Sequence, residues 1–231
     1  FRNADDTLEV AQDQKRQHLL HKLQLEPGMT LLDIGSGWGE LLFAAVKQYG
    51  VTGMGVTLSA EQYRHCVEKA KKLGVADKIK FELLNYQDLA ERAGLQFDRV
   101  ISVGMFEHVG RRNQGQYFGA VDKLLKPGGV SVLHTILVDR NPGNDPWIDK
   151  YIFPGGYLPE MAEITRSMAK HDQHIVDFES LRLHYAMTLD EWWRRYESHK
   201  AEVIKMYDKR FYRMWRFWLA MSSAGFRYGN L

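Results

Sequence analysis

Short apolar runs alternate with segments of helical spacing along residues 29–136. The runs cover residues 29–34, 51–56, 79–84, 95–103 and 130–136. Strands that alternate with helices at this spacing are typical of a parallel sheet with right-handed crossovers. An amphipathic helix, running from a cap near Asp6 to Leu25, precedes the first run. We therefore predict an α/β protein with a doubly wound, mostly parallel sheet.

The pattern changes beyond Val138. Residues 141–160 combine four prolines and three glycines with aromatic residues, which predicts an ordered loop that we interpret as a lid. Residues 174–183 resemble a sixth strand, and residues 188–224 predict one or two long helices dense in aromatic side chains. We interpret the chain as one domain, divided into an amino-terminal helical segment (1–28), a core (29–138) and a lid with an insertion (139–231).

Three glycines, Gly35, Gly37 and Gly39, separate the first predicted strand from the next helix. Glycine lets the backbone approach a ligand closely, and the helix amino terminus behind it suits a carboxylate or a phosphate. Asp33, inside the motif, would accept a hydrogen bond from an ammonium group and would repel a pyrophosphate. The pattern therefore favours the zwitterionic end of S-adenosylmethionine, although a purely structural strand, turn and helix has the same spacing.

Polar side chains follow the second and third predicted strands, at the edge where ligands bind in open α/β sheets. Thr57 and Gln62 would hold ribose hydroxyls through neutral groups, and Ser59 is the expected N-cap of the following helix. A capped helix start without a ligand is the simpler interpretation. Tyr86 is placed to stack on adenine, with a neighbouring amide bonding the edge of the base.

Composition narrows the class of protein. The 231 residues, 45% of them hydrophobic, are enough for one domain with a sizeable core, and the net charge of +2 creates no field that demands nucleic acid. A single cysteine, Cys66, excludes an intramolecular disulfide and indicates a reducing compartment. With no long apolar run and no signal-peptide pattern, we predict a cytoplasmic location. Residues 191–231 hold nine basic residues against four acidic ones.

Several segments together resemble the cyclopropane-fatty-acyl-phospholipid synthases. They lie at residues 32–39, 55–62, 102–110, 133–136 and 145–154. The glycine motif is shared by many methyltransferases, whereas Met-Phe-Glu-His, Leu-His-Thr-Ile and the Pro-Trp-Ile segment are far more specific. The resemblance implies the class I methyltransferase fold, which is Rossmann-like, with a helical, aromatic-rich, lipid-binding insertion.

The resemblance also implies a reaction and its site. A methyl group passes from S-adenosylmethionine to a cis double bond of a phospholipid acyl chain, a proton leaves the new methyl group, and the ring closes. A bound bicarbonate ion would be the base. Its expected ligands are Glu107, His134, the backbone of Ile136, and Tyr185. The expected cofactor-binding residues are Asp33, Gly35, Ser36, Gly37, Trp38, Gly39, Thr57, Leu58, Ser59, Gln62, Asn85, Tyr86 and Gln87.

The same resemblance sets expectations for what this chain lacks. A further bicarbonate ligand of the family is a Cys that precedes the position of Phe1, and Cys66, in the helix after the second strand, cannot replace it. The family has another strand after the position of Leu231, and longer bacterial members carry an amino-terminal accessory domain. We therefore expect this chain to be a catalytic domain trimmed at both ends.

Each candidate residue also has a simpler interpretation. Glu107 could bond locally with its neighbour His108, His134 could be a satisfied core histidine, and Tyr185 an ordinary strand tyrosine. His171 and His174 have i, i+3 spacing, but no other ligand pattern accompanies them, so we expect no metal. The aromatic rings of residues 192–218 are helix core by default, and the functional interpretation places some of them, with those of residues 151–157, along an acyl-chain tunnel.

The expected partner is phospholipid at the inner face of the membrane, where a basic cluster would dock the protein peripherally; by default that cluster is a solvated face. The cluster comprises Arg194, Arg195, Lys209, Arg210, Arg213 and Arg216. Competing functions are acyl-chain methylation, N-methylation of a small amine, and a catalytically inactive lipid- or cofactor-binding module. Nucleic-acid methylation is disfavoured because no Asn-Pro-Pro-Tyr-like motif occurs. The sequence leaves the oligomeric state open, a homodimer included.

Overall fold

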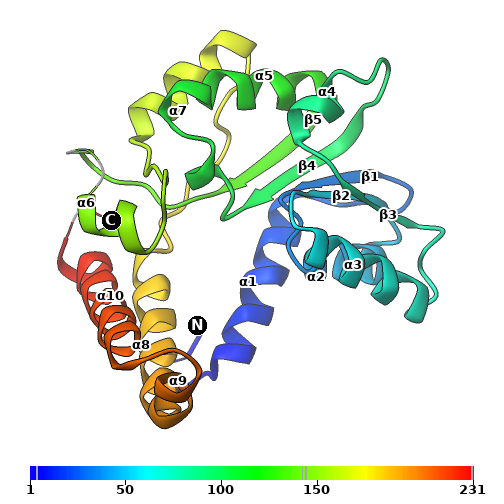
Figure 1. Cartoon of the computed structure of the whole chain (residues 1–231). Helices are drawn as coiled ribbons and strands as arrows, with labels where there is room; N and C mark the ends of the chain where they lie inside the picture. The colour runs from blue at the N-terminus through cyan, green and yellow to red at the C-terminus, as the bar shows by residue number, and fades with distance from the viewer. Residues whose placement is uncertain (4, 142, 144, 230) are drawn as a thin grey trace. The chain divides into compact units, whose positions relative to one another are not determined.

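Five parallel strands form the sheet that the alternating pattern predicts. The computed structural model describes residues 1–3, 5–141, 143, 145–229 and 231. The strands are β1 (Thr30–Ile34), β2 (Thr52–Thr57), β3 (Ile79–Leu83), β4 (Phe97–Val103) and β5 (Leu125–His134). Their order is β3-β2-β1-β4-β5, and every neighbouring pair is parallel (Figure 1). The chain order reverses next to β1, and this point of reversal is where doubly wound sheets bind ligands.

Helices cover both faces of this sheet (Figure 1). On one face lie α2 and α3 with the carboxy-terminal half of α1, and on the other lie α4, α5 and α7. Their bounds are α1 (Leu8–Lys22), α2 (Glu40–Tyr49), α3 (Ala60–Lys72), α4 (Tyr86–Ala90), α5 (Gln114–Leu124) and α7 (Met161–Met168). Strands buried on both faces need apolar residues at nearly every position. This is why the strands could be recognised in the sequence as apolar runs.

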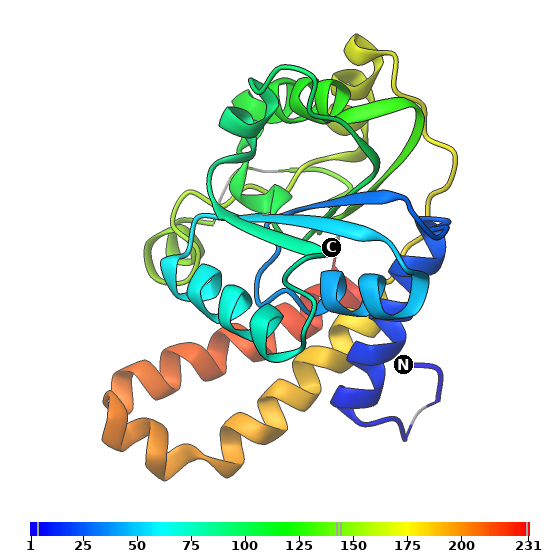
Figure 2. The ribbon, with the colours of Figure 1, turned by 90° about the vertical axis from the view of Figure 1, so that its right-hand side faces the viewer.

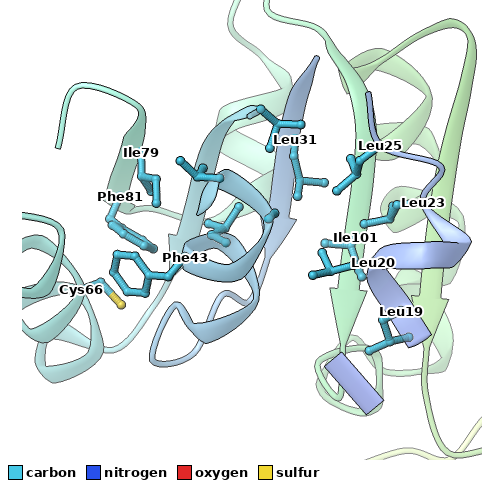
Figure 3. Close-up of a cluster of buried hydrophobic side chains, with 14 of the residues drawn as sticks. Leu19, Leu20, Leu23, Leu25, Leu31, Phe43, Cys66, Ile79, Phe81 and Ile101 are labelled. Carbon is cyan, nitrogen blue, oxygen red and sulfur yellow. The ribbon is translucent and has the colours of Figure 1, made fainter. Parts of the chain in front are cut away.

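A core cluster joins α1, α2 and α3 to the sheet (Figure 3). Leu20 and Leu23 of α1 are fully buried, as is Leu31 of β1. The rings of Phe43 and Phe81 pack with centroids 5.6 Å apart, joining α2 to β3. Each large apolar side chain buried in this way contributes about 1.5–3 kcal/mol. The glycine turn after β1 therefore lies next to a close-packed hydrophobic core.

The chain divides into two compact units. One holds residues 16–136 and 155–174, with the whole sheet, and the other holds residues 1–15, 137–154 and 175–231. In the second unit, α8 (Arg182–Ser198) and α10 (Lys209–Tyr228) lie side by side, and α9 (Lys200–Met206) forms the turn between them (Figure 2). We predicted one or two helices here. The structure has three, because the Asp208 carboxylate accepts the Phe211 N–H at 2.6 Å and starts a new helix.

The predicted sixth strand is wrong. Residues 174–181 adopt no regular structure, and α8 begins at Arg182. A strand needs a hydrogen-bonding neighbour, and none of the five described strands pairs with this segment. Val176 is accordingly 87% exposed. The predicted lid loop contains the short helix α6 (Pro146–Tyr151), and Pro142 lies outside the described residues.

Candidate active site

The glycine turn after β1 is closed by hydrogen bonds to β2. The N–H groups of Gly35 and Ser36 both donate to the carbonyl oxygen of Val56 at 3.0 Å. At Gly35 an added Cβ would lie 2.8 Å from Met105, whereas at Gly37 it would meet nothing within 4 Å. Gly37 has a φ of +55°, in the left-handed region that favours glycine. The turn therefore presents an open backbone face at Gly37, while Gly35 is required by packing.

Buried polar atoms lie in and beside this turn. Asp33 is only 4% exposed, and burial raises the pKa of its carboxyl to about 7. The hydroxyl of Ser36 is buried and has no hydrogen-bond partner among the described residues. Buried polar groups without partners are costly, and such atoms mark places where a ligand completes the bonding. A cationic group near Asp33 would restore its charge, which suits the ammonium of S-adenosylmethionine.

A chain of hydrogen bonds organises the end of β2. The Thr57 hydroxyl donates to Gln62 Oε1 at 2.7 Å and accepts from the Ser59 N–H at 3.1 Å. Ser59 caps α3 by accepting the Gln62 N–H at 3.3 Å, as predicted. Because Oε1 of Gln62 is occupied, its NH₂ group is the part that can donate to a ribose hydroxyl. Leu58, between them, is 75% exposed.

After β3, the two amide side chains expected near adenine already have hydrogen-bond partners within the protein. The Asn85 side chain caps α4 by accepting the Gln87 N–H at 3.0 Å. The Gln87 amide donates to Gln116 at 3.0 Å. Both side chains would have to change partners to bond adenine. Tyr86 packs edge-on against Tyr117, with ring centroids 5.5 Å apart, and its stacking on adenine stays a prediction.

The predicted ligands after β4 and β5 come together. The two strands run in register with Val103 opposite His134, so their carboxyl ends meet. Glu107, in the short helical turn that follows β4, accepts the Ile136 N–H on Oε1 at 2.7 Å. Its Oε2 is buried and has no hydrogen-bond partner among the described residues. That atom is an acceptor without a donor among the described residues, so it can accept a hydrogen bond from a bound group.

Tyr185, the fourth predicted ligand, belongs to the other unit. It lies on α8 and stacks on Phe226 of α10, with ring centroids 4.4 Å apart. The interpretation as a strand tyrosine is therefore wrong, because the segment is helical. Its role beside Glu107 stays a prediction.

The contacts of two residues near the site were not predicted from the sequence. Tyr157, which we placed on a lid, donates its backbone N–H to the carbonyl oxygen of Glu107 at 2.8 Å. Tyr117 is buried and contacts both Tyr86 and Phe106, whose ring lies 4.9 Å from its own. Neither residue carries a local motif. Both contacts join segments that are far apart in sequence, so no periodicity could have revealed them.

The described part of the chain shows no metal site, no reactive thiol and no membrane-spanning helix. Within it, no three His, Cys, Asp or Glu side chains group as a metal site would require. Burial raises the pKa of the Cys66 thiol to about 11, and the thiol donates to Gly37 O at 3.4 Å, so Cys66 is a poor nucleophile. In the same residues, each helix is too short or too polar to cross a bilayer.

Comparisons with known proteins find relatives along the whole chain. A family model described as mycolic acid cyclopropane synthetase matches residues 1–231. The cyclopropane-fatty-acyl-phospholipid synthase of Escherichia coli K12 is 42% identical over 223 residues, or 96% of this chain and 56% of that protein. A probable fatty acid methyltransferase of Pseudomonas putida is 39% identical over 235 residues, or 99% of this chain and 59% of that protein. The chain thus spans about half the length of these curated relatives.

A solved structure extends the likeness to three dimensions. Mycolic acid cyclopropane synthase CmaA1, complexed with SAH and CTAB, superposes with a TM-score of 0.89. The match covers 100% of this chain and 84% of that chain at 31% sequence identity. Together with the parallel sheet, it establishes the predicted class I methyltransferase fold.

Proposed function

This chain belongs to the mycolic acid cyclopropane synthetase family, and from that premise we propose that it forms cyclopropane rings on phospholipid acyl chains with S-adenosylmethionine as the methyl donor. One observation carries the proposal. Glu107 is held through Oε1 by the Ile136 N–H, while its buried Oε2 has no partner among the described residues. This acceptor lies at the carboxyl ends of β4 and β5, the edge where ligands bind in such sheets.

The reaction requires a dry site that can accept one proton. A methyl cation added to an alkene leaves a carbocation, which water would trap. Hydrogens beside a carbocation are very acidic, so a weak base suffices if it is well placed. Aromatic faces lower the energy of a nearby cation. Glu107 serves this chemistry by presenting an acceptor atom in a buried position.

We propose bicarbonate as the group that completes this site. Glu107 Oε2 would accept its hydroxyl, His134 would donate from its imidazole, and the Ile136 backbone would line the same edge. Tyr185 is the fourth proposed partner. When bound, the ion would supply the base that takes the proton from the new methyl group. An anion in an apolar site needs such a set of partners, because a buried charge without them is costly.

The glycine turn is the proposed cofactor site. S-adenosylmethionine, when bound, supplies an electrophilic methyl group. The open face at Gly37 and the buried carboxyl of Asp33 suit its charged methionine end. Gln62 would donate to the ribose through its NH₂ group, and Tyr86 would stack on adenine.

Asp33 predicts a pH dependence of cofactor binding. Its pKa of about 7 in the free protein means that lowering the pH below 7 protonates the carboxyl. A neutral carboxyl must lose its proton to accept an ammonium hydrogen bond, so affinity should fall as pH falls, by up to about tenfold per unit. Calorimetry between about pH 6 and pH 8 measures this slope. Asp33→Asn should remove it, and an identical slope in that variant would contradict the role of Asp33.

The same pKa predicts the sign of a stability change in the ligand-free protein. The folded pKa of Asp33 lies above its unfolded value of 3.8, so the folded state holds the proton more tightly. The contribution of this group to stability therefore falls as pH rises from about 4 to 7.

We propose that the turn between α8 and α10 docks on an anionic membrane. Of the predicted basic cluster, Arg194 and Arg216 form ion pairs within the helical hairpin, and Arg195 pairs with Glu9 of α1. The other three form none with the described residues, and they follow the exposed Met206 and Tyr207 in the sequence. These three are Lys209, Arg210 and Arg213. Exposed apolar side chains next to these three cations in the sequence favour binding to an anionic lipid surface.

Changing these three residues to alanine should weaken vesicle binding. Each basic residue near an anionic leaflet is worth about 1 kcal/mol, so the triple variant should lose roughly a hundredfold in partitioning. Co-sedimentation with vesicles that contain anionic phospholipid measures the change. A matched triple variant of Lys71, Lys72 and Lys78, which are exposed in the other unit, is the control. Equal losses in both would show a net-charge effect and remove the assignment.

Product analysis tests the proposed function. The purified full-length protein, vesicles of unsaturated phospholipid and S-adenosylmethionine with a labelled methyl group should yield labelled ring-containing fatty acids. Acyl-chain methylation is the second candidate, because a relative at 39% identity bears the name of a probable fatty acid methyltransferase. Labelled methyl-branched chains without rings would favour it, and a labelled amine would exclude both. A homodimer stays a prediction, tested by sedimentation of the same preparation.

A further inference from the structure

Residues 155–174 pack against the segment that carries Glu107. The backbone N–H of Tyr157 donates to the Glu107 carbonyl oxygen at 2.8 Å. Further along, the Nε2 atom of His171 lies 3.0 Å from the carbonyl oxygen of Gly115 at the start of α5. Glu107 is therefore held twice: its side chain by the Ile136 N–H just after β5, and its main chain by Tyr157.

A buried carboxylate anchors Tyr157. Glu163, near the start of α7, is 7% exposed. Its Oε2 accepts the Tyr157 hydroxyl at 2.7 Å and the Glu160 N–H at 3.3 Å, and its Oε1 lies 2.7 Å from Arg111 Nε. Arg111 belongs to the same loop as Glu107, just before α5. Glu163 therefore links Tyr157 to this loop, because its Oε2 binds the Tyr157 hydroxyl and its Oε1 binds Arg111.

The charge of Glu163 persists at neutral pH. Burial acts to raise the pKa of its carboxyl, but the hydrogen bond from Tyr157, the Glu160 N–H and the charge of Arg111 outweigh it and hold the pKa below the usual range. Burial and the neighbouring Glu163 raise the pKa of Tyr157 to about 12, so its hydroxyl keeps its proton. The bond is a neutral donor to an ionised acceptor, which is stronger than a neutral pair.

We propose that Glu163 is a positioning residue for Glu107, acting through the Tyr157 hydroxyl. The proposal rests on the proposed function, because it concerns the placement of the proton acceptor. Loss of the ring anchor would free the Tyr157 backbone, loosen the Glu107 main chain and displace Oε2 from the reacting carbon. A displacement of about 1 Å can cost as much as a hundredfold in rate.

A displaced acceptor also predicts a change in products. If the proton of the new methyl group is removed too slowly, the carbocation has two other fates. It can lose a proton from a neighbouring chain carbon, whose C–H electron pair forms a new double bond and gives a methyl-branched alkene. It can instead bond to water, which then loses a proton and leaves a methyl-branched alcohol. A merely structural defect lowers the amount of active enzyme and leaves the product ratio unchanged.

The test is Tyr157→Phe in the full-length protein. The variant keeps the ring and removes only the hydroxyl. We expect kcat for ring formation to fall about tenfold, the ratio of cyclopropane to methyl-branched product to fall, and the Kd for S-adenosylmethionine to stay unchanged. Glu163→Gln should do the same. Both variants weaken or remove the bond between Tyr157 and Glu163, although Glu163→Gln also removes the ion pair with Arg111, so the loss in the double variant should be smaller than the sum of the two single losses.

Hydrogen exchange supplies a readout that does not depend on turnover. In both variants the amides of residues 104–110 and of Tyr157 should exchange faster than in the unmodified protein. The matched control is Glu91→Gln, which removes a charge from an exposed pair with Lys123 at 2.8 Å in the same unit. It should change neither the product ratio nor these exchange rates.

Three results would overturn the positioning role: an unchanged product ratio in Tyr157→Phe, additive effects in the double variant, or unchanged exchange at residues 104–110. A different result bears on the proposed function. If the unmodified full-length protein forms no ring, that function fails, and the exchange rates alone then decide whether Glu163 holds this loop.

Discussion

Glu107→Gln is expected to lower the rate of ring formation by about a thousandfold, the middle of the range for a general acid or base. Glutamine can still accept the Ile136 N–H, so the local fold should persist. Its NH₂ group donates where Oε2 accepts, and the negative charge is lost. The site then repels the hydroxyl that it is proposed to bind. Single-turnover assays with unsaturated phospholipid measure the loss.

The Kd for S-adenosylmethionine separates this effect from damage to the fold. Because the proposed cofactor contacts lie at the ends of β1, β2 and β3, Glu107→Gln should leave that Kd within about twofold, below the 1.4 kcal/mol that makes a factor of ten. Glu91→Gln, which has the same charge change in an exposed pair with Lys123, should retain full activity. A large loss of cofactor affinity in Glu107→Gln would contradict the assignment to the proton-accepting site.

Gly39→Ala is expected to destabilise the protein by about 3 kcal/mol, from left-handed backbone strain and overpacking. Gly39 has a φ of +77°, and a Cβ there would lie 2.9 Å from both Phe43 and Phe81. These rings belong to the close-packed core and have little room to shift. Equilibrium unfolding in urea measures the change in the free energy of unfolding.

Gly74→Ala is the matched control, because Gly74 has a φ of +66° and nothing within 4 Å of an added Cβ. It should cost only the backbone strain, about 1 kcal/mol. Gly37→Ala should behave like Gly74→Ala in stability and still weaken cofactor binding, because its Cβ would project into the proposed site. Equal stability losses at all three glycines would refute the separate packing role of Gly39.

The sheet was predictable because each strand carries its own signal. The strand expected at residues 51–56 is Thr52–Thr57, and the strand expected at 79–84 is Ile79–Leu83. The strand expected from residue 130 begins earlier, at Leu125, since Leu125 pairs with Phe97 of β4 and a register shift separates this pair from the next one, Val130 with Arg99. The Lys-Pro-Gly-Gly sequence at residues 126–129 is typical of a turn, yet it lies within β5 because the residues on both sides of it pair with β4.

The site was only partly predictable. The residues at strand ends, such as Asp33 and Glu107, follow from sheet topology once the strands are known. The contact between Tyr157 and Glu107 does not, because it joins a loop after α6 to the end of β4. The helical state of Tyr185 was also missed, since alternating apolar residues at 174–183 look like a strand until no partner is found. Long-range pairing, which sequence periodicity does not encode, accounts for both.

The most direct test of the central claim follows the hydrogens of the transferred methyl group. S-adenosylmethionine with a fully deuterated methyl group, incubated with the full-length protein and unsaturated phospholipid, should give fatty acids that retain two of the three deuterium atoms in a ring methylene. That result requires methyl transfer followed by removal of one proton from the methyl carbon. Products that retain all three deuterium atoms would show methyl transfer without ring closure, and would contradict the account of Glu107 as part of a proton-accepting site.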